Sequence, residues 1–242
     1  VGGGQGGARA CASAEAARRW GSLDSEEGAP LDADEHDLRE DEHMVRSPAG
    51  TRWIRSSRRY SLEETYTIFF EPADNRKRKG KTERRYEEGI QLVGSFSSIQ
   101  EFWRFWNAMD LHKLGSYCSL SVFKDPVKPL WEDERNRDGG QWVLGCEDKA
   151  AAVDHFTKVA LSLIGGYFEC HVDLCGTTFA VKPGAHKIGL WCRRADRALR
   201  APVEHELREL LGLENDEGVT VEFREHHGEI RRNAAGRRAA GG

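Results

Sequence analysis

The sequence lacks several features that would assign a chain of 242 residues to a large protein class. Its six cysteines include no Cys-x-x-Cys pair, and the compact group of Cys170, His171 and Cys175 lacks the second half of a zinc site. No apolar run approaches the length that crosses a membrane, and no secretory apolar region is present. We therefore expect reduced, mostly buried thiols in a cytosolic protein that uses no metal, no cofactor and no membrane.

An excess of positive charge is also missing, because the formal net charge is −4. Without a general attraction for nucleic acid, any binding of that kind requires a local site. The basic run over residues 76–85 is expected to be a solvated loop, with contact to phosphates as the alternative. The acids Glu132, Asp133 and Glu134 lack an accompanying nucleophile, metal cluster or Gly-rich phosphate loop, so a nucleotide hydrolase is the least favoured class.

The composition, 38% hydrophobic and 31% charged, suits one globular domain with polar extensions. Residues 1–57 combine a Gly/Ala-rich run with an acidic run and are predicted to be disordered. Residues 230–242, rich in Gly, Ala and Arg, are predicted to be a second disordered tail. The ordered domain is predicted over residues 58–229. The chain begins at Val1 rather than Met, as a fragment of a longer chain would.

Strands and amphipathic helices alternate in the predicted domain. Ser98 and Glu101 form a capping box that opens one helix. A second helix is predicted from about 150 to 164, and a third is predicted to begin at Pro202. Strands are predicted at 65–70, 89–96, 118–124, 141–146, 177–182, 187–192 and 218–223. This order predicts an α+β fold, a curved antiparallel sheet with three helices on one face.

The stretch from Lys128 to Trp142 is rich in Pro, Asp, Asn and Gly and is predicted to be a loop. It places Trp131 directly before Glu132. An aromatic plane beside a carboxylate can stack on an unpaired guanine and accept hydrogen bonds from its N1–H and N2–H₂ edge. The alternative is that Trp131 packs under the loop while the acids are solvated. These residues alone leave both interpretations open.

Six ordered motifs resemble the eukaryotic translation initiation factor 4E family, proteins that bind the 7-methylguanosine cap of mRNA. The motifs span 96–103, 120–125, 129–136, 139–142, 172–176 and 187–191, and the resemblance extends from about Tyr60 to Phe223. It implies a cupped antiparallel sheet with three helices on its convex face and the cap in its concave face.

The resemblance also implies roles for individual residues around the cap. Trp131 is one slab of an aromatic sandwich, and the opposing slab falls on Tyr86. Glu132 holds the guanine edge, and Trp191 walls the N7-methyl group. Best-known members have Trp at the position of Tyr86, whereas Tyr is similar to the 4E-homologous-protein branch, which tends to repress initiation.

Phosphate contacts are implied for Lys182 and Lys187, although the family more often has Arg at the first position. Gln141 lies where many members have another Arg. Lysine is a point charge without the fork of arginine. We therefore expect a weaker grip on the cap than in the best-known members.

On the convex face, the resemblance implies a groove for a partner peptide of Tyr-x₄-Leu-hydrophobic type. The residues assigned to this groove are Leu62, Ile99, Trp103, Lys158 and Leu161. Lys158 falls where several members have an acid, so the partner set is expected to shift toward acidic peptides. The alternative for Trp103 is an ordinary residue at the edge of the core.

Taken together, these features predict a non-enzymatic protein that binds capped mRNA and acts in cap-dependent translation initiation or its regulation. It is expected in the cytoplasm, with the nucleus as an additional location. The alternative is a cap-competing repressor, or a weak cap binder that works through its convex surface and a scaffold or binding protein.

Overall fold

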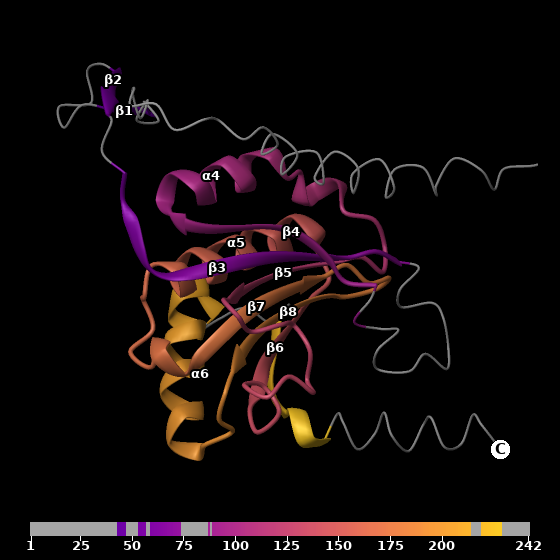
Figure 1. Cartoon of the computed structure of the whole chain (residues 1–242). Helices are drawn as coiled ribbons and strands as arrows, with labels where there is room; N and C mark the ends of the chain where they lie inside the picture. Colours follow the sequence, from indigo (N-terminus) through magenta and orange to yellow (C-terminus); the bar gives the residue numbers. More distant parts are fainter. Residues whose placement is uncertain are drawn as a thin grey trace, which may run out of the picture.

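The computed structural model describes residues 59–73, 87, 89–213 and 219–228, together with the backbone of 43–46 and 53–56 (Figure 1). Predictions for the basic run at 76–85, the tail at 230–242 and the side chain of Tyr86 fall outside these described residues.

The centre of the molecule is a seven-stranded sheet in the order β4-β3-β5-β7-β8-β6-β9. Every neighbouring pair is antiparallel. The strands are β3 (Ser61–Glu71), β4 (Gln91–Ser98), β5 (Ser119–Lys124), β6 (Gly140–Cys146), β7 (Leu174–Ala180), β8 (His186–Cys192) and β9 (Val219–Glu225). The predicted α+β fold with an antiparallel sheet is confirmed.

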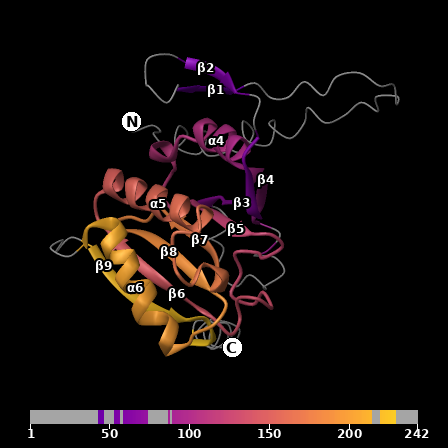
Figure 2. The same cartoon turned by 90° about the vertical axis from the view of Figure 1, so that its left-hand side faces the viewer.

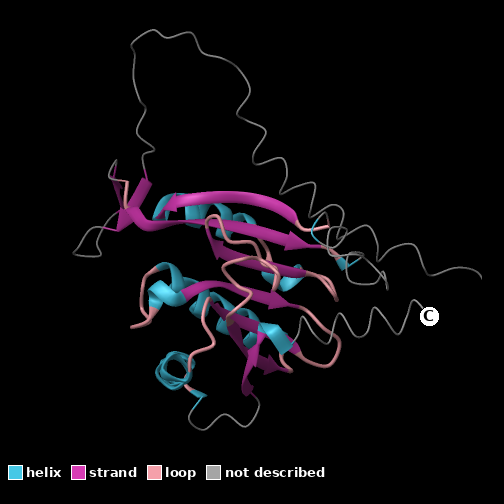
Figure 3. Cartoon of the chain, turned by 60° about the horizontal axis from the view of Figure 1, so that its bottom comes forward, coloured by secondary structure: helices cyan, strands magenta, loops and turns pink. Residues whose placement is uncertain are grey.

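Three α-helices cover one face of this sheet (Figure 2). They are α4 (Ile99–Ala108), α5 (Lys149–Ile164) and α6 (Arg197–Leu211), and the short 3₁₀ helices η1 (Leu111–Lys113) and η2 (His171–Asp173) lie in the connections. In Figure 3 the helices, drawn in cyan, lie behind and beside the strands. None of the helices in the described part of the chain is long and apolar enough to cross a membrane.

The alternation of side chains along each strand separates the two faces of the sheet. On β3, Tyr66, Ile68 and Phe70 belong to the large core beneath the helices. Phe69 instead packs on a small apolar cluster on the opposite face, formed by Phe123, Val127, Cys175 and Trp191. One face of the sheet therefore supports the helices, and the other is open to a ligand.

Helix α4 begins as its capping box predicts. The hydroxyl of Ser98 accepts a hydrogen bond from the backbone N–H of Glu101 at 3.4 Å. The carboxylate of Glu101 accepts from the backbone N–H of Ser97 at 2.9 Å, one residue earlier than in the usual reciprocal pair. The backbone carbonyl of Tyr60 accepts from Ile99 N at 2.9 Å, which ties the start of the domain to this helix.

Helix α6 corrects one prediction, because it begins at Arg197 and holds Pro202 in its interior. The carboxylate of Asp196 accepts from the backbone N–H of Ala198 at 3.0 Å and caps the helix one and a half turns before the proline. Such a cap stabilises a helix start, whereas a proline near the start removes a single hydrogen bond. Gly212, at φ 69°, ends the helix.

Two short strands lie inside the segment predicted to be disordered. β1 (His43–Arg46) and β2 (Trp53–Ser56) pair antiparallel, with Val45 opposite Ile54. Since β-branched residues favour extended backbone, this pairing is consistent with local strand propensity. The disorder predicted over 1–57 remains a prediction: apart from 43–46 and 53–56, residues 1–57 lie outside the described residues.

Candidate functional site

A cavity of about 250 Å³ opens on the face of the sheet opposite α4, α5 and α6. Six strands and the loop between β5 and β6 contribute to its wall. Its lining residues are Phe69, Glu71, Ile90, Ser119, Ser121, Pro129, Leu130, Trp131, Glu132, Gln141, Val143, Thr178, Ala180, Lys182, Lys187, Ile188, Gly189, Trp191 and Arg224. The cavity thus combines aromatic rings with charges of both signs, a composition suited to a charged aromatic ligand.

Gly189 of β8 keeps the floor of the cavity open. A Cβ atom at this position would come within 2.6 Å of both Gln141 Oε1 and Thr178 Oγ1. Real Cβ atoms do not tolerate such distances, so any side chain would push its neighbours aside. Because residue 189 is a glycine, the side chains of Gln141 on β6, Thr178 on β7 and Trp191 on β8 can approach its backbone closely.

The loop from Asp125 to Gly139 is held by one buried asparagine. Asn136 Nδ2 donates to the carbonyl of Lys128 at 2.7 Å and to that of Leu130 at 2.9 Å. The carboxylate of Asp133 adds hydrogen bonds from the backbone N–H groups of Lys128 and Arg135, at 3.2 and 3.0 Å. A polar loop with so many internal hydrogen bonds has few alternative conformations, so Trp131 and Glu132 between them are preorganised.

The side chain of Trp131 combines features of both interpretations of this residue. It is half-buried and packs on the cluster of Phe123, Val127, Cys175 and Trp191, yet it still lines the cavity. Its indole N–H is buried without a hydrogen-bond partner among the described residues. Glu132 beside it is half-buried and also lines the cavity.

Trp191 of β8 also lines the cavity and is only 5% exposed. Its indole N–H donates to Thr178 Oγ1 at 3.4 Å, and its ring meets Phe123 edge-on with centroids 5.3 Å apart. On its other side lies the ring of His226, with a centroid distance of 4.4 Å. The orientation of this indole is therefore fixed on several sides.

His226 links the wall of the cavity to its loop, a role that the sequence did not reveal. The ring is fully buried, and its Nδ1 donates to the backbone carbonyl of Asn136 at 2.7 Å. Burial lowers the pKa of this imidazole to about 4, so the ring is neutral near pH 7. Nothing in its local sequence distinguishes it from the exposed His227 that follows.

The cations and acids of the cavity come from separate strands. Lys187 lies on β8 and Lys182 in the turn before it, and both line the cavity. Their contact with phosphates remains a prediction. Glu71, at the end of β3, is buried and accepts a hydrogen bond from Ser119 Oγ at 2.9 Å. Glu71 and Arg224 were missed by sequence reasoning, although the period-two alternation of their strands assigns both to this face.

Tyr86 lies outside the described residues, but its neighbour Glu87 is described. Lys128 Nζ donates to Glu87 Oε1 at 2.6 Å. This ion pair joins the segment before β4 to the start of the loop that carries Trp131. The part of the chain next to Tyr86 is thus tethered at the rim of the cavity.

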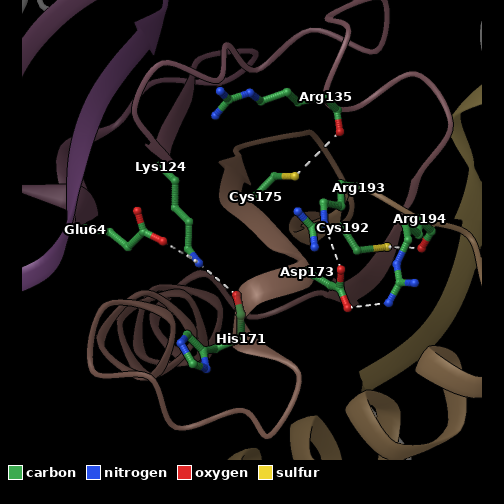
Figure 4. A network of polar contacts seen from close by, with 9 residues as sticks. All are labelled: Glu64, Lys124, Arg135, His171, Asp173, Cys175, Cys192, Arg193 and Arg194. Carbon is green, nitrogen blue, oxygen red and sulfur yellow. Dashed lines mark hydrogen bonds and ion pairs between the residues drawn. The ribbon is translucent and has the colours of Figure 1, made fainter.

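Figure 4 shows a polar network where η2 meets the ends of the central strands. Asp173 accepts from Arg193 Nε at 2.7 Å and from Arg194 at 2.6 Å, and Lys124 Nζ donates to the carbonyl of His171 at 2.8 Å. Burial alone would raise the pKa of Asp173, but hydrogen bonds and charges from the two arginines outweigh it and lower that pKa. The network fastens β7 to β8 beside the cavity.

Thiols near this network are shielded by burial, as the sequence analysis expected. Burial raises the pKa of Cys175 to about 12 and that of Cys192 to about 11. Among the described residues, no group of three or more His, Cys, Asp or Glu side chains could hold a metal ion. Cys170, His171 and Cys175 therefore form no such group with other described residues.

The helix-covered side carries a second surface of interest, the predicted partner groove. Ile99, Trp103 and Leu161 are 44%, 40% and 36% exposed on α4 and α5. Trp103 is thus an exposed residue rather than part of the core. Leu62 is half-buried and packs on the core, and Lys158 pairs with Asp154 at 2.8 Å, one helical turn away.

A model of the protein family "Eukaryotic initiation factor 4E" matches residues 61–240, well over half of the chain. The chain belongs to the eukaryotic initiation factor 4E family. The resemblance seen in the six sequence motifs is thereby confirmed. The matched range includes every strand of the seven-stranded sheet and all three helices.

Individual relatives in the initiation factor 4E family are moderately similar. Eukaryotic translation initiation factor 4E-1B of Danio rerio is 31% identical over 141 residues, which make up 56% of this chain and 66% of the relative. Factor 4E-1A of the same fish is 32% identical over 55% of this chain and 61% of the relative. The chain thus spans slightly less than two thirds of these two proteins. The Homo sapiens factor is 29% identical over 71% of this chain and 73% of the relative.

Solved structures of initiation factor 4E proteins have the same fold. The complex of C. elegans eIF4E-3 with the 4E-binding protein Mextli and cap analog matches with a TM-score of 0.63 at 22% identity, over 72% of this chain and 96% of that one. Ascaris suum eIF4E-3 with m7G cap matches with a TM-score of 0.62 at 24% identity, over 70% of this chain and 92% of that one. At this identity the likeness establishes the architecture alone.

Proposed function

We propose that the protein binds the 7-methylguanosine 5′ cap of mRNA in the cavity on the face of the sheet opposite α4, α5 and α6. One observation supports this most directly: Trp131 and Glu132 lie side by side on a hydrogen-bonded loop at a cavity that also contains Trp191 and two lysines. Such a site offers an aromatic face, an acceptor for the guanine edge and cations for phosphates. Membership of the initiation factor 4E family, and the cap ligand named for a relative of the same fold, agree with this assignment.

The aromatic sandwich is proposed to consist of Trp131 and Tyr86. Methylation at N7 gives guanine a delocalised positive charge, so stacking on electron-rich rings gains a cation–π contribution of roughly 1–2 kcal/mol per ring when desolvated. Base stacking itself contributes about 1–3 kcal/mol. The ion pair between Lys128 and Glu87 supports this pairing because it holds the residue after Tyr86 at the loop of Trp131. Trp191 is proposed to wall the N7-methyl group.

Recognition of the base and phosphates is proposed to be electrostatic. The N7 charge makes the guanine N1–H more acidic and strengthens its charge-assisted hydrogen bond to Glu132. Lys182 and Lys187 are proposed to face the phosphates. In this role the protein binds and does not catalyse, and we propose that it uses no cofactor.

The experiment that tests this function is retention on immobilised cap analogue. We expect elution by 7-methyl-GTP at concentrations where unmethylated GTP releases little protein, because only the methylated base carries the cationic charge. Equal elution by both nucleotides would contradict the aromatic sandwich. Absence of any retention would contradict cap binding itself.

A second proposed role is binding of a protein partner through the helix-covered surface. Ile99, Trp103 and Leu161 expose apolar area that suits an amphipathic helix of Tyr-x₄-Leu-hydrophobic type, supplied by a scaffold or binding protein. Lys158 at its rim favours acidic peptides, although its ion pair with Asp154 offsets part of that charge. Both an initiation factor and a cap-competing repressor need such a surface.

We propose that the protein acts in cap-dependent translation initiation or its regulation, in the cytoplasm and also in the nucleus. The two roles differ in what the partner brings. An activator recruits a scaffold that engages the ribosome, whereas a repressor occupies the cap without doing so. Purification of the partner bound at Trp103 from cell extract, with the Trp103→Ala variant as control, distinguishes them.

A further inference from the structure

Arg224 is the one arginine among the described residues that line the cavity. It lies on β9 directly opposite Gln141 of β6, and Gln141 lies opposite Trp191 of β8. The three residues form one row across the sheet, on the face that carries the cavity. Adjacent strands are about 4.8 Å apart, so Arg224 starts two strand spacings from the tryptophan that walls the cavity.

The register of β9 fixes the direction in which Arg224 extends. Phe223, its neighbour, packs against Trp142 with ring centroids 5.0 Å apart, on the core side of the sheet. Arg200 of α6 lies over the same phenylalanine ring at 4.3 Å, which holds it from the helical side. Because side chains alternate along a strand, Arg224 is turned to the cavity side.

The guanidinium of Arg224 forms an ion pair with Glu222, which is a weak competitor for an anion bound in the cavity. Its Nε and Nη2 atoms donate to the same carboxylate oxygen of Glu222, at 3.0 and 2.7 Å. The two side chains are 33% and 62% exposed. An ion pair so open to solvent contributes little stability. A multiply charged anion in the cavity can therefore draw the guanidinium away from Glu222 at small cost.

Arg224 supplies a planar, forked cation, which Gln141, Lys182 and Lys187 lack. Gln141 is neutral, and Lys182 and Lys187 are point charges. The planar guanidinium can donate two parallel hydrogen bonds to one phosphate group. The neutral Gln141 is one of the three departures, with Tyr86 and Lys182, that predict a weaker grip on the cap. Arg224 on the adjacent strand provides the positive charge that Gln141 lacks.

We propose that Arg224 binds a phosphate group of the nucleotide's 5′ polyphosphate, and that Glu222 holds the guanidinium at the rim until the phosphate displaces it. This inference rests on the proposed function of the cavity. It makes β9 part of the binding site and assigns the phosphate contact at this row to residue 224 in place of residue 141.

The test compares two ligands that differ only in their phosphates, 7-methyl-GTP and 7-methylguanosine, by fluorescence titration. Arg224→Gln is expected to weaken binding of 7-methyl-GTP by about five- to tenfold, the scale of one screened charge-assisted contact. Binding of 7-methylguanosine is expected to stay within about twofold of wild type, because the base and its methyl group keep their contacts. The loss for 7-methyl-GTP should shrink as salt is raised.

Two further variants make the test specific. Arg208→Gln removes a comparable arginine from a partly buried ion pair with Glu204 on α6, away from the cavity, and is expected to change neither affinity. Glu222→Gln removes the competing acid and is expected to tighten 7-methyl-GTP binding by about two- to threefold with no gain for the nucleoside. This variant decides the question if Arg224→Gln does not fold.

An equal loss for both ligands in Arg224→Gln, or no loss for either, would overturn the assignment of Arg224 to the phosphates. Unchanged binding in Glu222→Gln would overturn the competition between the acid and the phosphate. If the wild-type protein binds neither ligand, the proposed cap-binding function falls, and the role of Arg224 falls with it. If the wild-type protein binds both ligands and Arg224→Gln binds them equally well, only the role of Arg224 falls and the proposed cap-binding function stays in place.

Discussion

Single residues of the cavity differ in what they can discriminate. Glu132 lines the cavity next to Trp131, and its carboxylate is proposed to accept hydrogen bonds from the guanine edge. Its Glu134 neighbour is exposed on the same loop and lines no part of the cavity. The pair therefore provides a matched comparison of one acid inside the site and one outside it.

Glu132→Gln is expected to weaken 7-methyl-GTP binding by about 2–3 kcal/mol, because an amide replaces an acceptor that bonds to a charged base. The preference for guanine over adenine should fall with it. Isothermal titration measures both, with Glu134→Gln as the control that keeps wild-type affinity. An unchanged dissociation constant in Glu132→Gln would remove this residue from the site.

Trp131→Ala is expected to abolish cap retention. Because the ring also packs on the cluster around Phe123 and Trp191, the free energy of unfolding should fall by about 1–2 kcal/mol, the scale of a partly buried apolar side chain. Urea denaturation and far-UV circular dichroism measure this cost. Loss of the folded signal altogether would mean that Trp131 is a core residue and not a stacking face.

Sequence reasoning identified the site residues that have distinctive chemistry. Trp131, Glu132, Lys182, Lys187 and Trp191 all line one cavity, and their roles toward a cap remain predictions. The residues that were missed act through their position. Period-two alternation places Glu71 and Arg224 on one face of their strands, but strand register and tertiary contacts between distant segments decide that this face carries the cavity.

At the scale of elements, the loop between β5 and β6 depends on Asn136. Asn136→Ala is expected to lower the free energy of unfolding by about 1–3 kcal/mol, because it removes two hydrogen bonds. The carbonyls of Lys128 and Leu130 keep their backbone donors, the N–H groups of Leu130 and Asp133. Cap affinity should fall as the loop loses its single conformation. Urea denaturation and cap titration measure these effects, with the exposed Asn107→Ala on α4 as control. Wild-type affinity in Asn136→Ala would show that the loop is held by other contacts.

The exposed stripe on α4 and α5 is a second element with a separable role. Trp103→Ala is expected to abolish binding of a Tyr-x₄-Leu-hydrophobic peptide while cap affinity and stability stay at wild-type values, because Trp103 is exposed and remote from the cavity lining. Fluorescence anisotropy with a labelled peptide measures this. Tyr117→Ala, which removes another exposed aromatic ring, serves as control. If Trp103→Ala still binds the peptide, Trp103 is an exposed residue that takes no part in peptide binding.

The elements themselves were largely predictable, since hydrophobic periodicity and caps are local signals. Strand β3 extends to Ser61, beyond the predicted start at residue 65. Helix α6 begins five residues before Pro202, because a cap at Asp196 outweighs the cost of an internal proline. Tertiary pairing lengthened the strand, whereas a local signal that the sequence analysis passed over set the helix start.

At the scale of the whole molecule, we expect the free energy of unfolding to depend on pH because His226 is buried. Burial lowers its pKa to about 4 in the folded state, whereas the unfolded chain has the ordinary value near 6.5. The unfolded state therefore binds the proton first, and stability from this group is present above about pH 6.5 and lost as the pH falls toward 4. The full loss is about 3 kcal/mol.

The measurement is the free energy of unfolding by urea between pH 7 and 4. His226→Gln is expected to lower stability at pH 7 and to flatten this dependence, while the exposed His205→Gln on α6 keeps it. A variant that retains the full acid-dependent loss would assign the dependence to another group.

The order of the strands has a consequence for how the protein is made. The cavity draws on Phe69 near the beginning of the domain and on Arg224 of β9, the last strand of the sheet in sequence order. During synthesis the chain emerges from the ribosome from its amino end, so the wall of the cavity is unfinished until β9 has left the exit tunnel. Chains released early would lack Arg224 and the rest of β9, so their cavity would remain incomplete.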